Sequence, residues 1–211
     1  MNQPFRWSIA SIAVFIVCTV SFFCADMQIA LWVHGHQTLE SNAIFKYLTR
    51  FGQSEWYLVP GFSAFLLFRK NRPSVSRAGL FVFAAVAISG LAADLLKYLL
   101  PRARPGAFLE SGWFGFRIFP LPHGWDNAWN SFPSGHSATA FSAAAVFSIL
   151  FPRFRFLFFS AAALIAFSRI AVGKHYVSDV IAGSFLGLGT SILLFNLYFR
   201  RNPDEQATPH I

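Results

Sequence analysis

The chain has 211 residues, of which 55% are hydrophobic, 18% aromatic and only 12% charged, and its mean hydropathy is +0.49. Ordinary soluble domains carry about 25% charged residues, so this composition excludes a surface that faces water on all sides. The formal net charge of +8 would suit nucleic acid, but the placement of the basic residues described below indicates a membrane and no nucleic-acid partner.

Six apolar segments predict six membrane-spanning helices: residues 7–24, 56–68, 78–96, 137–151, 156–172 and 180–199. Several of them reach the roughly 18 to 20 residues that cross a bilayer, and neutral flanks extend the shorter ones. Segment 56–68 is short and contains Pro60 and Gly61, which membrane helices tolerate where neighbours satisfy the backbone. The expected fold is all-α, a six-transmembrane-helix bundle forming a single membrane domain over residues 1–211.

The first apolar segment is expected to be a retained anchor. Arg6 precedes it as in a signal peptide, but residues 21–24 are bulky where a processing site needs small side chains. Cys18 and Cys24 lie on this same helix, too far apart to bridge each other, and are expected to be buried packing residues.

The basic residues predict an orientation. With the N-terminus inside, six spans place nine of the seventeen on the cytoplasmic side, as the positive-inside rule expects: Arg6, Arg69, Lys70, Arg72, Arg77, Arg153, Arg155, Arg200 and Arg201. The other eight need another reason to lie outside: Lys46, Arg50, Lys97, Arg102, Arg104, Arg117, Arg169 and Lys174. We therefore expect a multi-pass protein of a cell inner membrane.

Three hydrophilic stretches connect or follow the spans. Residues 34–54 mix charged and apolar side chains and are expected to lie as an amphipathic segment on the membrane surface. Residues 101–135 are rich in Trp and Phe, which suits either anchoring at the headgroup layer or a grip on a lipid by the loop 106–132. Residues 202–211 form a polar tail that is expected to be disordered.

Three polar clusters interrupt the apolar pattern at the ends of spans. They are Lys97 with Arg104-Pro105, then Pro133-Ser134-Gly135-His136, then Ser168-Arg169 with His175 and Asp179. Because successive spans alternate in direction, all three clusters fall on one face of the membrane. Lys97, Arg104 and Arg169 concentrate positive charge there, which predicts an anion site.

Pro133-Ser134-Gly135 opens a helix, so free backbone N–H groups and the positive end of the helix dipole add donors to this site. Glycine permits close approach of a phosphate, and His136 stands in the first turn. His175 and Asp179 are four residues apart, which on one helix face would let the carboxylate orient the imidazole. One histidine could then attack phosphorus while the other protonates the departing oxygen, without a metal or any other cofactor.

Together the three clusters resemble the complete three-part signature of the type 2 phosphatidic acid phosphatase family, bacterial membrane type. The matching residues are Lys97 with Arg104-Pro105, then Pro133-Ser134-Gly135-His136, then Ser168-Arg169 with His175 and Asp179. No motif position departs from it, and the motif-bearing core spans about residues 75–185. The resemblance implies a membrane phosphatase in which His175 becomes a phosphohistidine, Asp179 orients it and His136 is the general acid. It also implies that the phosphate is held by Lys97, Arg104, Ser134, Gly135 and Arg169.

Other polar or small residues have plainer interpretations. Asp94 could pair with Lys97 or with Arg169, in either a functional or a purely structural role. Lys174 is expected to face the headgroups, and Gly183 and Gly187 are expected to let helices pack closely. The histidines without metal-like spacing are expected at the surface or interface: His34, His36, His123 and His210.

The leading functional hypothesis is an integral membrane lipid phosphate or diphosphate phosphatase with its active site on the periplasmic face. Undecaprenyl diphosphate, phosphatidylglycerol phosphate and a lipid A phosphate are the candidate substrates. Two alternatives remain: a phosphotransferase that passes phosphate to a lipid acceptor, and a non-catalytic lipid-binding or transport protein. A protein that only binds has no use for a nucleophile and an acid, so the two histidines favour an enzyme.

Overall fold

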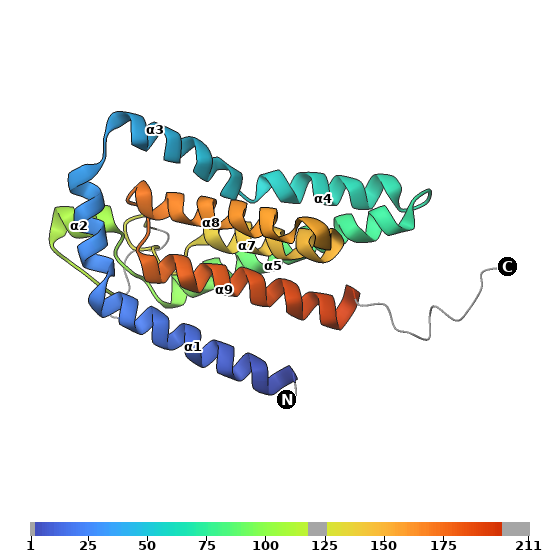
Figure 1. Cartoon of the computed structure of the whole chain (residues 1–211), viewed down its shortest axis with the longest axis horizontal. Helices are drawn as coiled ribbons and strands as arrows, with labels where there is room; N and C mark the ends of the chain where they lie inside the picture. The colour runs from blue at the N-terminus through green and yellow to red at the C-terminus, as the bar shows by residue number, and fades with distance from the viewer. Residues whose placement is uncertain (1–2, 118–125, 200–211) are drawn as a thin grey trace.

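The computed structural model describes residues 3–117 and 126–199, with side chains described from residue 7 onward (Figure 1). The predicted polar tail, His123, His210 and the inner part of the aromatic loop lie outside these residues. Apart from two isolated bridges at Arg102, the described residues form helices and loops, so the predicted all-α class is confirmed.

Most of the long helices lie side by side, roughly along the long axis of the molecule, and α2 crosses that axis at one end (Figure 1). In chain order they are α1 (Gln3–Cys24), α2 (Asp26–His36), α3 (Leu39–Leu48), the 3-10 turn η1 (Thr49–Gly52), α4 (Glu55–Phe68), α5 (Pro73–Leu99), α6 (Pro105–Ser111), α7 (Gly135–Leu150), the 3-10 turn Pro152–Phe154, α8 (Arg155–Ala171) and α9 (Val177–Leu194), which continues as the π turn Phe195–Phe199.

Each of the six predicted spans is a helix, but the count of six full-length spans needs correction. Four helical segments of the described chain are long and apolar enough to cross a membrane: Trp7–Cys24, Pro73–Leu99, Pro152–Ala171 and Val177–Phe199. Helix α7 has 16 residues and α4 has 14, so both are shorter than a typical span. The protein is an integral membrane protein of helical type.

Residues 34–54 form several elements and not one segment, and their place on the membrane surface stays a prediction. They divide among the end of α2, helix α3 and the turn η1, and both α3 and η1 pack against α8. In Figure 1, α3 and α4 follow each other along the bundle, so α3 extends the short α4. Phe45 explains part of this packing, because its ring lies edge-on to that of Phe167 at 5.7 Å between centroids.

Helix α7 is the centre of the bundle and packs against α5, α8 and α9. Its contact with α9 is close because two glycines of α9 have no side chain to separate the backbones. A Cβ at Gly183 would lie 2.3 Å from the Ser134 carbonyl oxygen, and one at Gly187 would lie 2.1 Å from that of Ala138. The predicted role of these two glycines in helix packing is confirmed.

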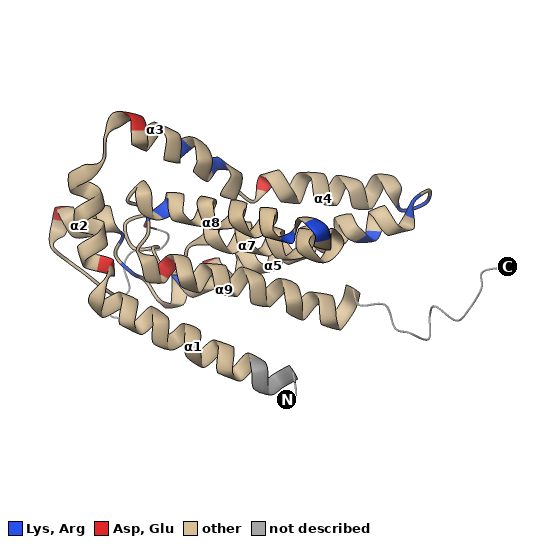
Figure 2. Ribbon diagram, viewed as in Figure 1, with Lys and Arg blue, Asp and Glu red and all other residues tan. Residues whose placement is uncertain are grey.

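The two ends of the bundle differ in charge (Figure 2). One end carries the loop between α4 and α5 and the start of α8, and its ionised side chains are basic: Arg69, Lys70, Arg72, Arg77, Arg153 and Arg155. The other end holds α2 and α6, together with the end of α5, the start of α7, the end of α8 and the start of α9. All three sequence clusters therefore meet at this second end.

Candidate phosphate site

Three cations come together from three separate elements. Lys97 is in the last turn of α5, Arg104 directly precedes α6, and Arg169 is in the last turn of α8. Asp94 forms an ion pair with Lys97 at 2.8 Å between Oδ1 and Nζ, which resolves the two pairings left open by the sequence. Arg169 Nη1 donates to Thr49 Oγ1 at 2.8 Å.

The guanidinium groups of Arg104 and Arg169 each have a hydrogen-bond donor without an acceptor. The Nε atoms of both are buried and have no hydrogen-bond partner among the described residues. Arg102 Nε is also buried without a partner, but Arg104 and Arg169 differ from Arg102 in having no carboxylate partner among the described residues. A buried N–H without a partner costs about 1–3 kcal/mol, so these two guanidinium groups favour an anion that accepts from both. Arginine suits this task because its planar fork matches the oxygens of a phosphate.

The start of α7 supplies backbone donors. Ser134 is the N-cap residue, and its Oγ accepts from the Ser137 amide at 3.4 Å. The Ser134 amide itself donates to the Asp179 carbonyl at 3.0 Å, which ties the start of α7 to the first turn of α9. Lys97 Nζ lies 3.1 Å from the point that a Cβ at Gly135 would occupy, so a side chain there would displace the ammonium group by a few tenths of an ångström.

His136 stands beside these donors in the first turn of α7. The charges of Arg169, Lys97 and Arg104 and the ring of His175 all act on it electrostatically, which places the two histidines and the three cations around one space. The turn η1 closes a wall of this space, because a Cβ at Gly52 would lie 3.0 Å from His136 Cβ. Thr49 and Gly52 thus bring the segment 34–54 into the site.

His175 is buried. The four-residue spacing predicted that it would share a helix with Asp179, and this prediction was wrong. It lies in the loop before α9, whose first turn carries Asp179. His175 Nδ1 donates to the Ser131 carbonyl at 2.8 Å and lies 3.6 Å from Asp179 Oδ2. Both acceptors favour the proton on Nδ1, which leaves the lone pair on Nε2 for attack.

Burial lowers the pKa of His175 from 6.5 to about 4, and the positive charges of Arg169 and Arg104 act in the same direction. The hydrogen bond and negative charge of Asp179 oppose this shift but do not cancel it. His175 is therefore neutral at physiological pH, the state that a nucleophilic imidazole requires.

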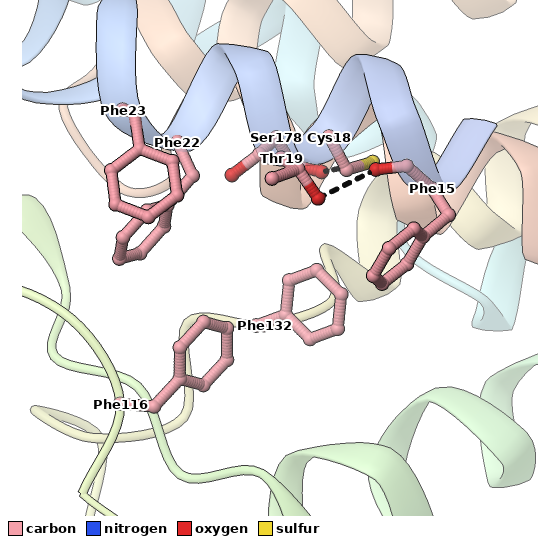
Figure 3. A pocket seen from close by; sticks show the side chains of 8 residues that line it. All are labelled: Phe15, Cys18, Thr19, Phe22, Phe23, Phe116, Phe132 and Ser178. Carbon is pink, nitrogen blue, oxygen red and sulfur yellow. Dashed lines mark hydrogen bonds between the residues drawn. The ribbon is translucent and has the colours of Figure 1, made fainter. Parts of the chain in front are cut away.

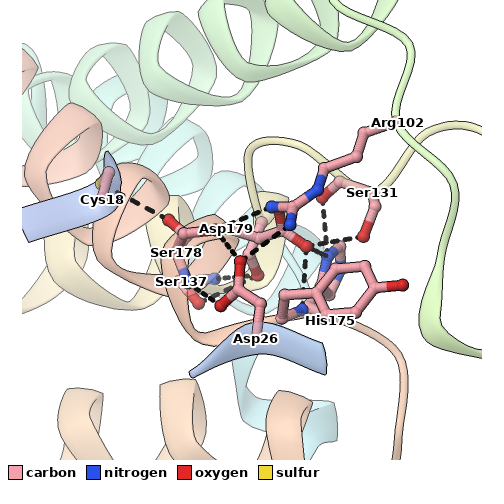
Figure 4. A network of polar contacts seen from close by, with 10 residues as sticks. Cys18, Asp26, Arg102, Ser131, Ser137, His175, Ser178 and Asp179 are labelled. Carbon is pink, nitrogen blue, oxygen red and sulfur yellow. Dashed lines mark hydrogen bonds and ion pairs between the residues drawn. The ribbon is translucent and has the colours of Figure 1, made fainter. Parts of the chain in front are cut away.

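Asp179 is fully buried and accepts hydrogen bonds on both oxygens (Figure 4). Its Oδ1 accepts from Arg102 Nη1 at 2.5 Å, and its Oδ2 accepts from Ser131 Oγ at 2.6 Å and from the Tyr176 amide at 2.9 Å. Arg102 also donates to Asp26 Oδ2 at 2.7 Å through Nη2. The carboxylate that faces His175 is thus held from behind by a second arginine.

Sequence reasoning missed four residues of this site: Asp26, Thr49, Arg102 and Ser131. Two of them carried a usable signal. Asp26 is a carboxylate directly after an apolar span, where ionisable groups are functional candidates, and Arg102 lies inside the first motif. Thr49 and Ser131 carried none, because a hydroxyl or carbonyl in a short turn or loop gains its role only from the fold.

The described part of the aromatic loop packs on α1 next to the site. Phe22 of α1 contacts the rings of Phe114 and Phe116 at 5.0 and 5.9 Å between centroids. A cavity of about 260 Å³ lies beside this contact and is lined by Phe15, Cys18, Thr19, Phe22, Phe23, Phe116, Phe132 and Ser178 (Figure 3). None of the predicted phosphate ligands lines it, so this apolar space is separate from the anion site.

All eight predicted site residues therefore meet at one end of a membrane-embedded helical bundle: Lys97, Arg104, Ser134, Gly135, His136, Arg169, His175 and Asp179. This arrangement defines a membrane protein with two histidines beside a cationic anion site. The family model described as PAP2 superfamily matches residues 78–203. The chain belongs to the PAP2 superfamily, as its motifs indicated.

Similar proteins support this membership. A lipid A 1-phosphatase of Rhizobium johnstonii is 38% identical over 72% of this chain and 66% of the relative, and a lipid A 1-phosphatase of Rhizobium etli is 33% identical over 93% and 87%. An undecaprenyl-diphosphatase of Sulfolobus acidocaldarius is 25% identical over 80% of this chain and 76% of the relative.

Two solved structures share the fold. The crystal structure of Aquifex aeolicus LpxE superposes with a TM-score of 0.60 at 24% identity, covering 84% of this chain and 98% of that one. A transmembrane PAP2-type phosphatidylglycerolphosphate phosphatase from Bacillus subtilis superposes with a TM-score of 0.61 at 20% identity, covering 95% and 98%.

Proposed function

We propose that this protein hydrolyses a lipid phosphate through a phosphohistidine at His175. The observation that carries the proposal is the placement of a neutral, oriented His175 and of His136 around donors that have no acceptor in the described chain. A lipid-binding protein would need the cations alone. Membership of a phosphatase superfamily supports the same conclusion.

In the first step, the Nε2 lone pair of His175 attacks phosphorus and the bond from phosphorus to the lipid oxygen breaks. The electron pair of that bond goes to the lipid oxygen, which takes a proton from His136. A bound phosphate dianion favours the protonated form of His136, because an opposite charge nearby stabilises the imidazolium. Arg104, Arg169 and Lys97 hold the oxygens of the transferring group.

In the second step, neutral His136 takes a proton from water as the water oxygen attacks the phosphohistidine. The bond between Nε2 and phosphorus breaks, its electron pair returns to His175, and inorganic phosphate leaves. The site can thus run both steps with one acid and base residue that alternates in role. The cations and the α7 N-terminus supply the charge stabilisation that a metal supplies in other phosphatases.

For the substrate, we propose a lipid A phosphate ahead of undecaprenyl diphosphate and phosphatidylglycerol phosphate. Two relatives at 38% and 33% identity, which align with 72% and 93% of this chain, carry the name lipid A 1-phosphatase. Purified protein should therefore release orthophosphate fastest from lipid A 1-phosphate in a panel of these three lipids. Phosphate appearing on an added lipid acceptor instead of in solution would identify a phosphotransferase.

Activity should also survive chelation. Incubation with excess EDTA, followed by the same phosphate-release assay, is expected to leave the rate unchanged. Loss of activity that one added divalent ion restores would contradict this part of the proposal.

We further propose that the site faces the periplasm of an inner membrane. The end of the bundle opposite the site carries six basic side chains and no acidic residue among the described ones, which favours the cytoplasmic side for that end (Figure 2). The test is labelling of single cysteines placed at residue 115 and in the loop 69–72, in intact cells with an impermeant thiol reagent. Labelling of the cysteine in the loop 69–72 alone would show the opposite orientation, with the site facing the cytoplasm.

A further inference from the structure

A buried cluster behind His175 has no role in the steps above. It consists of Asp26 at the start of α2, Arg102 in the segment after α5, and Ser178 and Asp179 at the start of α9, and is called here the rear cluster (Figure 4). The side chains of Asp26, Arg102 and Asp179 have 0% exposure. Three ionised groups without solvent contact are costly, so their retention at this position needs a reason.

Arg102 bridges the two carboxylates. Its Nη1 donates to Asp179 Oδ1 at 2.5 Å and to Ser178 Oγ at 2.7 Å, and its Nη2 donates to Asp26 Oδ2 at 2.7 Å. Asp26 also accepts from the Ser178 amide at 3.0 Å and from Ser178 Oγ at 2.5 Å. Each carboxylate is surrounded by donors, which is the environment of an ionised carboxylate.

Aromatic rings close the cluster off from lipid and water. The Arg102 guanidinium lies 4.4 Å from the centroid of the Tyr176 ring and 4.9 Å from that of Phe22, with Phe116 and Phe114 at 5.2 and 5.7 Å. In such a dry environment, charges act on one another strongly. The net charge of the rear cluster is therefore felt at His175, whose ring contacts Asp179.

That net charge is one negative unit, because two carboxylates surround one guanidinium. Asp179 paired with Arg102 alone would be neutral and would no longer stabilise a cation. Asp26 restores the missing negative charge from a different helix. When Nε2 of His175 bonds to phosphorus while Nδ1 keeps its proton, the ring becomes an imidazolium, and one negative unit behind it balances that charge.

We propose that Asp26 and Arg102 are positioning residues of the phosphohistidine reaction, which fix Asp179 and set the charge behind His175 at one negative unit. Asp26 thereby makes the junction of α1 and α2 part of the catalytic apparatus, although it lies more than 140 residues before His175 in sequence. This inference rests on the proposed role of His175 as nucleophile.

Substitutions that change the charge of the cluster in opposite directions test the inference. Asp26→Asn makes the cluster neutral, and Arg102→Gln gives it two negative units. The double variant D26N/R102Q returns it to one negative unit with an amide pair that can hydrogen-bond. Ser178→Ala loosens the same cluster without changing its charge and is the matched control.

The primary measurement is the pH at which His175 titrates, followed by ¹⁵N NMR of histidine-labelled protein, with the His175 signal assigned by its loss in His175→Ala. The charged groups that face this ring are Asp179 from α9, Arg169 from α8, Arg104 before α6 and His136 from α7. All four are unchanged in these variants. The pKa of His175 should fall in D26N, rise in R102Q and return toward the parent value in the double variant.

The rate should follow the same logic. We expect kcat to fall about 10- to 100-fold in D26N and in R102Q, with KM changed less than about 3-fold. The double variant should have a kcat about 10-fold or more above that of either single variant, and Arg102→Lys should exceed R102Q by a similar factor. S178A is expected to lower the melting temperature without moving the His175 titration. A merely structural cluster would instead lower stability in all variants and leave both the titration and kcat per folded molecule unmoved, which would overturn the inference.

Two further outcomes are distinguishable. If R102Q does not fold, D26N and the double variant still decide, because the first must lower the His175 pKa and the second must restore it. If His175→Ala retains the parent rate, the proposed function fails whatever the rear cluster does. If His175→Ala is inactive while D26N keeps the parent titration and kcat, only the inference about Asp26 and Arg102 fails.

Discussion

Arg102 and Arg104 are two residues apart in one motif, yet they serve opposite sides of the same histidine. Arg102 is fully buried, and both of its terminal nitrogens donate to carboxylates. Arg104 has no carboxylate partner within the described chain, which is the difference between the two, since the Nε atom of each lacks an acceptor there. The backbone between them pairs with residues 128–131, through Arg102 N to the Trp129 carbonyl and Arg104 N to the Ala128 carbonyl.

The difference shows how a structural ion cluster and a ligand site can be told apart. A cation whose charge is paired with carboxylates inside the protein holds other groups in place, whereas a buried cation without a carboxylate partner is ready for an anion. The motif contains both kinds, and its spacing alone does not separate them. Substitutions on the two sides should therefore fail in different ways.

The largest effect is expected at His175, which lies between the phosphate ligands and the rear cluster. His175→Ala should lower kcat by at least about 10⁴-fold, because no other group can form the covalent intermediate. Orthovanadate, which mimics the transferring phosphoryl group, should still bind within a few-fold, since the cations remain. Substantial turnover in this variant, measured by phosphate release, would remove His175 from the nucleophile role.

Next in size is the contrast between the arginines. Arg104→Gln should weaken orthovanadate binding by about 10- to 100-fold, which corresponds to the roughly 1.5–3 kcal/mol of a hydrogen bond to a charged group. Arg102→Gln should leave orthovanadate affinity nearly unchanged, because its guanidinium faces away from the anion. Calorimetric titration of both variants decides the matter, and equal losses of affinity would place the two arginines in one site.

The pH dependence of the unmodified protein should show the effect of burial on His175. Its pKa is lowered from 6.5 to about 4, so the ring stays neutral as pH falls from 7 to 5, where an exposed histidine becomes protonated. Nucleophile protonation should therefore not slow phosphoryl transfer in this range. A ¹⁵N titration of His175 with a midpoint near 6.5 would show that the ring is more exposed to water than the structure indicates.

The smallest effect is expected from one methyl group added at Gly135, next to the cations that are proposed to hold the phosphate. Gly135→Ala places a Cβ 3.1 Å from Lys97 Nζ, the far end of a flexible side chain, so the fold should hold while orthovanadate affinity drops several-fold. Gly183→Ala is the matched comparison, because its Cβ would meet the Ser134 backbone at 2.3 Å. It should cost about 1–3 kcal/mol of stability, seen as a lower melting temperature. Equal melting temperatures would contradict this difference.

The sequence pattern located the phosphate ligands well because most of them sit at or next to the end of an apolar helix. Alternation of span direction was enough to bring Lys97, His136 and Arg169 to one face. The route to His175 was less well predicted, since the spacing to Asp179 suggested a helix where the chain forms a loop closed by the Ser131 carbonyl.

The rear cluster could not be predicted in the same way. Asp26 and Ser178 are 152 residues apart, and Arg102 is 76 residues from Asp26, so their pairing arises only when α1, α2 and α9 pack. The packing of α3 and η1 against α8 could not be predicted from the sequence either, because a mixture of charged and apolar residues suits a membrane surface as well as a helical bundle. Long-range contacts of single side chains are what the sequence pattern does not contain.

The central claim is that phosphate passes through His175, and a rapid-quench experiment tests it most directly. Purified protein mixed with ³²P-labelled lipid A 1-phosphate and quenched in alkali should carry acid-labile label on the peptide that contains His175, in an amount that rises before orthophosphate appears. Orthophosphate released at the full rate with no labelled protein, or with label on another residue, would contradict the account.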